Sequence, residues 1–505
     1  MLAAPGLGHI PRQGRRSAPK AVQKAMLRTV LYVIGLLLCI LAAAMLLPAM
    51  VDYAAGDVDW RVFIASAGLT AYAGGSMILA FRAPHVHIRA REGFLLTTGS
   101  WLAVSAFGSL PLIFSSLQLS PADAVFETVS GLTTTGATVL TGLDTMAPGL
   151  LFWRSLLQWI GGVGIIVAAI FMLPLLRVGG MQLFRSESSD ISEKVAPRVY
   201  QIASLTIVIY AVLTFACAIC LVVVGMTPFD AINHAMATLA TGGFSTRDAS
   251  VGFYNSVPIE LVLVIFMVAG ALPLVFYAML VKDGQRAWRQ EKQVPAFLLT
   301  LAAAILAVTF WRVSSSPEDF GHALREATFN VTSVITDTGF ASTDFSKWGT
   351  GAHALFLLLM FIGGCAGSTS GSIKIFRWQI LFRSFAVHLK RNIAPHRMIV
   401  PRYRDKPVDD DMVSSVRNFF FMYILTWGVV STLLMFTGLD FLSSGSAVAT
   451  AMANAGPGLG PIVGPGTTFA SVSDSAKWLL SAAMLLGRLE LTTVYILFLP
   501  DFWRN

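Results

Sequence analysis

Four short stretches of the chain contain a glycine turn and combine residue types that suit the binding of a dehydrated cation. They are TTTGAT (133–138), ATGGFST (240–246), ITDTGFAST (335–343) and NAGPGLG (454–460). Backbone carbonyl oxygens can replace the hydration shell of a monovalent cation, and glycine permits the unusual φ and the close approach that such a turn requires. One glycine-rich turn is weak evidence, but four in comparable settings predict a common binding site.

The four turns recur at a near-constant interval. Aligned on one glycine each, they fall at Gly136, Gly243, Gly339 and Gly456, which are 107, 96 and 117 residues apart. Each follows a segment too short and too polar to cross a membrane, which we expect to be a short helix with proline or aspartate near its start. Such self-similarity indicates four repeated units, each consisting of a span, a short helix, a glycine turn and a second span.

The composition places these turns in an integral membrane protein. The chain has 505 residues, of which 55% are hydrophobic and only 13% charged, and its mean hydropathy is +0.69. A membrane-spanning helix needs about 20 apolar residues to cross a hydrocarbon core of about 30 Å. We therefore expect ten spans, at 29–50, 61–81, 93–115, 150–175, 199–225, 257–281, 294–312, 352–364, 417–437 and 476–499.

The basic residues predict the orientation of the chain. With ten spans and an internal N-terminus, both termini are cytoplasmic, and 28 of the 36 lysines and arginines then fall in cytoplasmic segments. Positive charge accumulates on the cytoplasmic side of membrane proteins, so the distribution favours this topology and a cytoplasmic basic N-terminus at 1–28. It also accounts for the net charge of +8 without a nucleic-acid partner.

Taken together and in order, these motifs resemble the Trk/Ktr/HKT superfamily of potassium transporters, and most closely its TrkH-type membrane subunit. Besides the four turns, the matching stretches are WRSLLQWIGGVGII (153–166), GGCAGSTSGSIKIFR (363–377) and LGRLEL (486–491), and the likeness covers about residues 29–500. The resemblance implies an all-α integral membrane protein with four helix–pore-helix–helix repeats in pseudo-fourfold symmetry around one ion pore. Two extra N-terminal transmembrane helices precede them.

The resemblance also implies how the chain is divided. The two extra helices occupy 29–90, and the four repeats occupy 91–180, 181–285, 286–390 and 391–505.

The resemblance implies that each glycine and the two residues before it belong to a potassium selectivity filter. These residues are Thr134, Thr135, Gly136, Thr241, Gly242, Gly243, Asp337, Thr338, Gly339, Asn454, Ala455 and Gly456. In plant relatives a serine at the first of these glycines accompanies sodium transport, so Gly136 favours potassium. Asp337 stands where a neutral threonine or serine is expected. Its carboxylate either lies behind the filter and adds negative field, or caps the loop without a role in ion binding.

The third repeat contains a stretch that resembles the family's intramembrane gate loop. After the apolar residues 352–362 the chain becomes rich in small residues, which loosen a helix where a watery site can hydrate its backbone. The expected gate loop consists of Gly363, Gly364, Cys365, Ala366, Gly367, Ser368, Thr369, Ser370, Gly371 and Ser372. The alternative is a kinked helix that packs closely through glycine and serine. Lys374 and Arg377 follow, and we expect them to mark the return to the cytoplasm and to transmit movement from a regulatory partner.

Arg488 is a basic residue deep in the last expected span. An arginine at mid-bilayer costs about 2.5–3.5 kcal/mol on insertion scales, so a watery interior is the expected surrounding. The resemblance places Arg488 in the pore below the filter as a barrier to cations. The alternative is a structural ion pair with a buried carboxylate, although Glu490 is off the same helical face. Near the first turn, we expect Arg154 to anchor its span at the membrane interface, and a contact with Glu127 behind the filter is the alternative.

These expectations describe potassium uptake across the bacterial cytoplasmic (inner) membrane by a multi-pass, channel-like subunit in the lipid bilayer. The resemblance implies a homodimer docked on a cytoplasmic, nucleotide-binding TrkA-type regulatory subunit, so a nucleotide is expected only on that partner. No covalently bound cofactor and no enzymatic activity are expected, because H-E-x-x-H and G-x-S-x-G motifs are missing from the sequence. A cation–proton or cation–sodium symporter of the same fold is the main alternative, and a Kdp-type pump subunit is a more distant one.

Overall fold

The computed structural model describes residues 18–82, 90–172, 195–315, 319–394, 400–403 and 406–504. The first 17 residues and most of the expected cytoplasmic segment 177–198 lie outside the described residues. The fold is α-helical, as predicted. Within the described residues, β structure is confined to one small hairpin of strands β1 (Arg402–Tyr403) and β2 (Lys406–Pro407).

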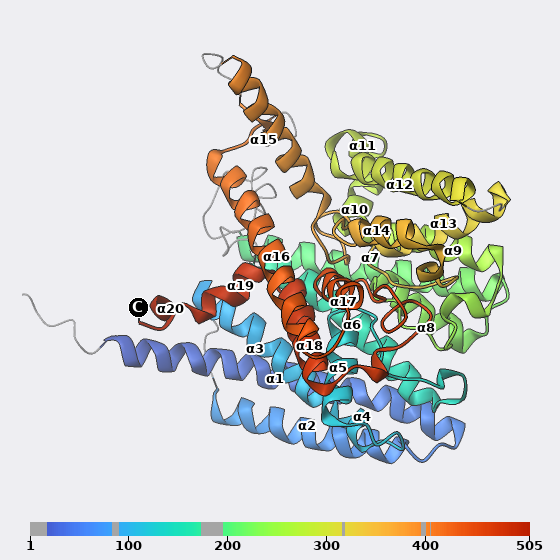
Figure 1. Ribbon diagram of the computed structural model, residues 1–505. Coiled ribbons are helices and arrows are strands. Elements are labelled where there is room, and N and C mark those ends of the chain that lie inside the picture. The colour runs from blue at the N-terminus through green and yellow to red at the C-terminus, as the bar shows by residue number, and fades with distance from the viewer. Residues whose placement is uncertain are drawn as a thin grey trace, which may run out of the picture.

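Seven helices in the described part of the chain are long and apolar enough to cross a membrane, and two further bent pairs bring the number to nine if each pair is one span. The first two, α1 (Ala18–Ala55) and α2 (Trp60–Ala80), lie side by side along one edge of the molecule (Figure 1). Gly35 and Gly74 allow this close packing, because a Cβ atom at either one would lie within 2.8 Å of the other's carbonyl oxygen.

The remaining helices follow the predicted order of span, short helix and span. The first group consists of α3 (Ala90–Gly108), α4 (Leu110–Phe114), the short helix α5 (Pro121–Leu132) and α6 (Pro148–Met172). The second group consists of α7 (Val195–Val223), the short helix α8 (Pro228–Leu239), α9 (Val257–Ala271) and α10 (Leu274–Asp283).

The third group begins after the brief helix α11 (Arg286–Gln290). It consists of α12 (Gln293–Ser315), the short helix α13 (Phe320–Ile335), α14 (Thr350–Leu359) and α15 (Ile375–Ile393). The fourth group consists of α16 (Asp410–Met435), the short helix α17 (Phe441–Ala453), α18 (Asp474–Arg488) and α19 (Leu491–Tyr495), and α20 (Pro500–Arg504) follows. Figure 1 shows α15 projecting from the body of the molecule together with the start of α16.

The four short helices α5, α8, α13 and α17 begin at polar caps. The side chains of Ser120, Thr227 and Asp319 accept hydrogen bonds from backbone N–H groups in the first turns of α5, α8 and α13, as the residue pattern predicted. Asp440 caps α17 in the same way. The caps fix where each short helix starts and therefore where its C-terminal end, with the glycine turn, lies.

Neighbouring groups are interlocked around a closed circuit. The second span of one group packs on the short helix of the next, as α6 does on α8 and α9 does on α13. The circuit returns from the fourth group to the first through α18, which packs on α5. This arrangement brings the ends of all four short helices towards the middle of the molecule.

Three of the expected spans are not the continuous helices that the hydropathy predicted. The span expected at 257–281 is bent by 91° between α9 and α10, where Pro273 lacks an N–H and Leu272 is extended. The span expected at 476–499 is bent by 110° after Arg488, where Glu490 has a φ of 60°. In the span expected at 352–364 the helix α14 (Thr350–Leu359) is only ten residues long and ends five residues before the span does.

Candidate ion pathway

Each short helix ends in the same backbone motif, which shapes the glycine turn. The N–H of Thr134 bonds to the carbonyl of Gly131, and the N–H of Thr135 bonds to the carbonyl of Ser130. This is a Schellman motif, whose closing residue adopts a left-handed conformation that favours glycine. Threonine, aspartate or asparagine occupies that position here, at Thr134 (φ 55°), Thr241 (51°), Asp337 (59°) and Asn454 (59°). A non-glycine residue in this conformation persists only where its surroundings impose it.

Two residues further on, each turn returns to positive φ at its glycine. The values are 84° at Gly136, 74° at Gly243, 86° at Gly339 and 93° at Gly456. Left-handed conformations therefore flank one ordinary residue in all four turns. A helix end of this kind leaves the following backbone extended and its carbonyl groups outside the helical ladder, where they are free to face a bound ion.

The four turns meet one another in a ring. A Cβ atom at Gly136 would overlap the carbonyl oxygen of Gly242, and one at Gly243 would overlap that of Thr338. The third turn meets the fourth in the same way, because a Cβ at Gly339 would overlap the carbonyl oxygen of Ala455. The ring closes where a Cβ at Gly456 would lie 3.1 Å from the carbonyl oxygen of Thr135. Glycine is therefore required at these positions by the approach of the neighbouring turn as well as by φ.

Gln158 on α6 holds the second turn from behind. Its Nε2 donates to the carbonyl oxygen of Gly242 at 2.6 Å, and its Oε1 accepts from the N–H of Phe244 at 3.1 Å. The sequence analysis did not single out Gln158, although an amide side chain in an otherwise apolar span is a signal that could have identified it. A buried amide with both ends bonded to backbone orients that backbone.

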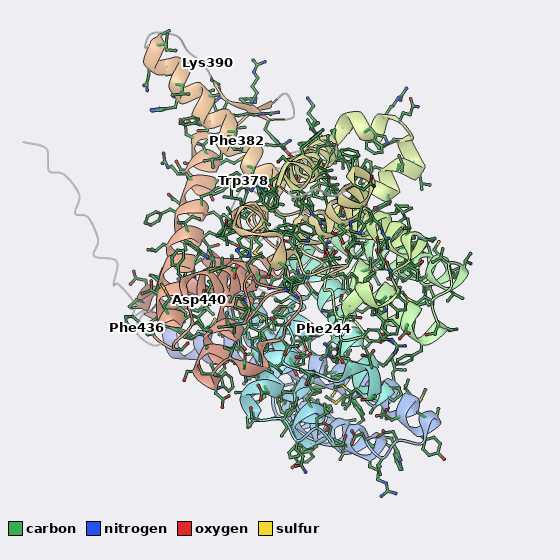
Figure 2. The ribbon with its side chains drawn as sticks, turned by 45° about the vertical axis from the view of Figure 1, so that its right-hand side comes forward. Phe244, Trp378, Phe382, Lys390, Phe436 and Asp440 are labelled. Carbon is green, nitrogen blue, oxygen red and sulfur yellow. The ribbon has the colours of Figure 1, made fainter. Side chains whose placement is uncertain are left out.

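A buried ion pair braces the first turn and joins it to the second. Arg154 Nε lies 2.8 Å from Glu127 Oε1, which confirms the contact considered from the sequence. Glu127 also accepts from the N–H of Val139 at 2.9 Å, while Arg154 donates to the carbonyl of Ser245 at 3.0 Å. Arg154 also stacks on the ring of Phe244, which lies within the body of the molecule in Figure 2. Buried charges need such full pairing.

The brace recurs at the same position of the next two short helices. In each of the first three repeats, a polar residue stands nine positions before the turn glycine. These residues are Glu127, His234 and Asn330. His234 is hydrogen-bonded to Ser245 Oγ at 3.0 Å, and Asn330 Nδ2 donates to Ser342 Oγ at 2.9 Å. In the first three repeats, a polar side chain on the short helix therefore pins the backbone that leaves the turn.

Asn454 joins the fourth turn to the first. Its Nδ2 donates to Thr135 Oγ1 at 2.9 Å and to the carbonyl of Met484 on α18 at 3.1 Å. The amide therefore bridges two turns that are 319 positions apart in the chain.

Below the ring, residues 363–372 form a loop that is docked on the broken end of α9. Cys365 N–H donates to the carbonyl of Ala271 at 2.9 Å, and Thr369 Oγ1 donates to the carbonyl of Gly270 at 3.0 Å. In return, the carbonyl of Gly367 accepts from the N–H of Leu274 at 3.0 Å. The loop thus satisfies backbone groups that the break at Pro273 frees, which a merely kinked helix would not do.

Arg488 reaches the same loop from the end of α18. Its Nη1 donates to the carbonyl oxygen of Thr369 at 2.8 Å, and the side chain is buried. Its Nε and Nη2 make no hydrogen bond, and no carboxylate of the described residues forms an ion pair with it. Glu490 is paired instead with Arg377, at 2.8 Å. Among the described residues, the alternative of a structural ion pair at Arg488 has no direct carboxylate contact to support it, and the barrier role stays a prediction.

Comparison with known proteins identifies the chain. The family model described as "TrkH: Cation transport protein" matches residues 61–504. The chain belongs to the TrkH family of cation transport proteins. It is 44% identical over 478 residues to the "Trk system potassium uptake protein TrkI" of Halomonas elongata, a match that covers 94% of this chain and 97% of that protein. It is 38% identical over 489 residues to the "Trk system potassium uptake protein TrkH" of Vibrio parahaemolyticus, covering 95% and 99%.

The fold agrees with that family. The crystal structure titled as that of the potassium transporter TrkH from Vibrio parahaemolyticus superposes with a TM-score of 0.88 at 35% identity, covering 95% of this chain and all of that one. The predicted fold class, an all-α membrane protein of the TrkH type, is confirmed. The family consists of cation transport proteins.

Two basic residues of this TrkH-family chain lie elsewhere than the sequence analysis expected. Lys374 and Arg377 were expected to mark the return to the cytoplasm, yet both point inwards. Lys374 Nζ donates to the carbonyl of Ser370, and Arg377 packs 3.8 Å from the ring centre of Phe419 while it pairs with Glu490. Lys374 directly precedes α15 and Arg377 lies in its first turn, and α15 leaves the body of the molecule only further along (Figure 1).

Proposed function

We propose that this chain conducts potassium across the membrane through the ring of its four glycine turns. The single observation that carries the proposal is the closed circuit of contacts from Gly136 to Gly242, from Gly243 to Thr338, from Gly339 to Ala455 and from Gly456 to Thr135. Four extended backbones at one axis supply carbonyl oxygens that replace the water around a monovalent cation. The names of the relatives, which are potassium uptake proteins, support potassium as that cation.

Below this filter, the loop 363–372 and Arg488 form the gate. The loop lies between the broken spans of the second and fourth repeats and contacts both, through Ala271 and through Arg488. The guanidinium group brings a positive charge, which has no direct ion pair among the described residues, to the inner side of the filter. A cation that leaves the filter meets this charge in surroundings where electrostatic repulsion is weakly screened.

The proposed orientation places the projecting end of α15 in the cytoplasm. The last turn of α15 carries Lys390 and Arg391, and Lys390 lies near the free end of the helix in Figure 2, beyond Trp378 and Phe382. Positive charge at this end agrees with both termini on the cytoplasmic side of the bacterial inner membrane. The division of the chain into repeats at 91–180, 181–285, 286–390 and 391–505 follows from the same topology.

We further propose that the functional assembly is a homodimer bound to a TrkA-type regulatory subunit that carries the nucleotide. The relatives are named as parts of a Trk system, which supports a transport assembly with more than one component. Since Lys374 and Arg377 are turned inwards, the partner would act on them indirectly, through the projecting part of α15 and the loop that precedes it.

The test is uptake of radioactive rubidium into liposomes that contain the purified full-length chain. The filter is supported if the liposomes take up potassium and rubidium in preference to sodium, and if Gly136→Ser reduces the uptake to background. Uptake that is equal for all three ions, or unaffected by Gly136→Ser in a folded protein, contradicts it.

The same liposomes separate a channel from the symporter alternative. A channel lets rubidium equilibrate at zero pH and sodium gradients, while a symporter requires one of those gradients for accumulation. We expect uptake to persist when both gradients are removed, and uptake that disappears with either gradient favours the symporter.

A further inference from the structure

Asp337 differs from its counterparts in the other three glycine turns. The corresponding positions hold Thr134, Thr241 and Asn454, all uncharged, whereas Asp337 carries a carboxylate that is completely buried. One carboxylate oxygen, Oδ2, accepts a hydrogen bond from Ser370 Oγ in the gate loop. The other, Oδ1, has no hydrogen-bond partner among the described residues. The turn and the gate loop are thus joined directly through one side chain.

Three charged side chains from three parts of the chain meet at two adjacent residues of the gate loop. The hydroxyl group of Ser370 donates a hydrogen bond to Asp337, and its carbonyl oxygen accepts one from Lys374. The carbonyl oxygen of Thr369, the residue before it, accepts a hydrogen bond from Arg488. The charge of Asp337 also lies close enough to Lys374 and Arg488 to interact with both. Hydrogen bonds to Thr369 and Ser370 therefore connect the third turn, the residue before α15 and the end of α18.

The bond also tightens the loop itself. Ser370 Oγ accepts from the N–H of Gly364 at 2.8 Å while it donates to Asp337. The hydroxyl group thereby links the two sides of the loop to the filter. If Asp337 releases Ser370, the loop loses a direct side-chain hydrogen bond to the third glycine turn.

We propose that Asp337 is a latch that fastens the closed gate loop to the third filter turn. This inference rests on the proposed function and adds a second device to the barrier at Arg488. A cation at the inner end of the filter attracts the carboxylate and competes with Ser370 for it, so that ion occupancy of the filter weakens the hold on the loop. The role belongs to Asp337 alone, because the other three turns lack a charge at this position.

The experiment compares rubidium uptake by liposomes containing the full-length wild-type chain, Asp337→Asn, Ser370→Ala and the double variant, with no regulatory partner. Asparagine keeps the left-handed conformation, as Asn454 does in the fourth turn. We expect each single change to raise uptake by about tenfold or more, because hydrogen bonds to a charged group are among the stronger ones in proteins. The double variant should show no more uptake than the larger single effect, since both changes act on one bond: Ser370→Ala removes its donor, and Asp337→Asn removes the charge of its acceptor.

Ser109→Ala is the matched control. Ser109 lies between α3 and α4, outside the glycine turns and the gate loop, and is also buried, and its hydroxyl group donates to the carbonyl of Ala106 at 2.8 Å. We expect its uptake to stay within about twofold of the wild type, since the bond it loses reaches neither the filter nor the gate loop. If Asp337→Asn does not fold, the comparison of Ser370→Ala with Ser109→Ala decides.

Several results would overturn the latch. Unchanged uptake in Ser370→Ala, additive effects in the double variant, or an equal rise in Ser109→Ala would each do so. A fall in uptake or a changed ratio of rubidium to sodium in Asp337→Asn would show that the carboxylate serves the filter itself. If neither the wild type nor Arg488→Ala takes up rubidium, the proposed function fails first, and the latch fails with it.

Discussion

Arg488 and Thr369, which lie on different repeats, are joined by a hydrogen bond of 2.8 Å from Nη1 to the carbonyl oxygen. The bond links the end of α18 to the middle of the loop that follows α14. Two other nitrogen atoms of the guanidinium group, Nε and Nη2, are buried and have no hydrogen-bond partner among the residues that the structure describes. A charge held in this way is costly for the fold, so its retention points to a role in conduction rather than in stability.

Replacing Arg488 with alanine should raise the basal flux of potassium. The change removes both the positive charge on the path and one of the bonds that hold the loop, so we expect at least a tenfold rise in rubidium uptake by liposomes. Arg488→Lys keeps the charge and serves as the control, with uptake close to that of the wild type. Equal uptake by wild-type and alanine proteins, both folded, would contradict the barrier.

Gly243→Ala should abolish selective uptake, because its new Cβ would overlap the carbonyl oxygen of Thr338 at φ 74°. Gly142 provides a matched control, since it has a φ of 75° but no atom within 4 Å of the added Cβ. Gly142→Ala thus carries only the backbone strain of about 1–2 kcal/mol that a left-handed residue costs. Rubidium uptake measures both variants, and similar uptake by the two would exclude the close contact as the reason for glycine.

Gln158→Leu should loosen the second turn. The leucine side chain cannot donate to the carbonyl of Gly242 or accept from the N–H of Phe244, so both backbone groups lose their buried partner. We expect a loss of preference for rubidium over sodium, measured as the ratio of the two uptakes, and a destabilisation of about 1–3 kcal/mol. Gln201→Leu, on the exposed side of α7, is the control and should leave the ratio unchanged. If Gln158→Leu keeps the wild-type ratio of rubidium to sodium uptake, the second turn holds its shape without Gln158.

Glu127→Gln should destabilise the folded protein strongly. It leaves Arg154 buried without a counter-charge, and breaking a buried pair costs about 3–5 kcal/mol. The control is Lys347→Met. The Lys347 side chain is 83% exposed and its Nζ lies 3.4 Å from Asp344 Oδ2. Such surface ion pairs contribute about 0–1 kcal/mol. The stabilities of the two variants are compared in detergent by unfolding them with heat or with denaturant. Similar stability losses would mean that the ion pair does not brace the first turn.

Much of the fold could be predicted because the repeated units carry local signals. Proline and aspartate near the start of a short helix and glycine at its end depend on backbone preferences that are readable along the chain. The bends after Ala271 and Arg488 were missed, since both lie in segments whose hydropathy suits a continuous span. Pro273 was a local signal for the first bend, but Glu490 gave none for the second.

The candidate site was only partly predictable, because its decisive contacts join residues that are distant in sequence. The glycine positions indicated where the turns are, but the ring depends on pairs such as Asn454 with Thr135, which no local pattern connects. Lys374 and Arg377 are expected to mark the return to the cytoplasm, because basic residues usually avoid the membrane interior. Their partners, the carbonyl of Ser370 and the carboxylate of Glu490, are supplied by the tertiary fold.

The most direct test of the account is to locate rubidium by its anomalous scattering in crystals of the full-length chain grown with rubidium. We predict a peak on the axis of the ring, surrounded by backbone carbonyl oxygens of the turns at Gly136, Gly243, Gly339 and Gly456. An ordered structure in which rubidium is bound elsewhere, with the ring unoccupied or the four turns apart, would contradict the central claim.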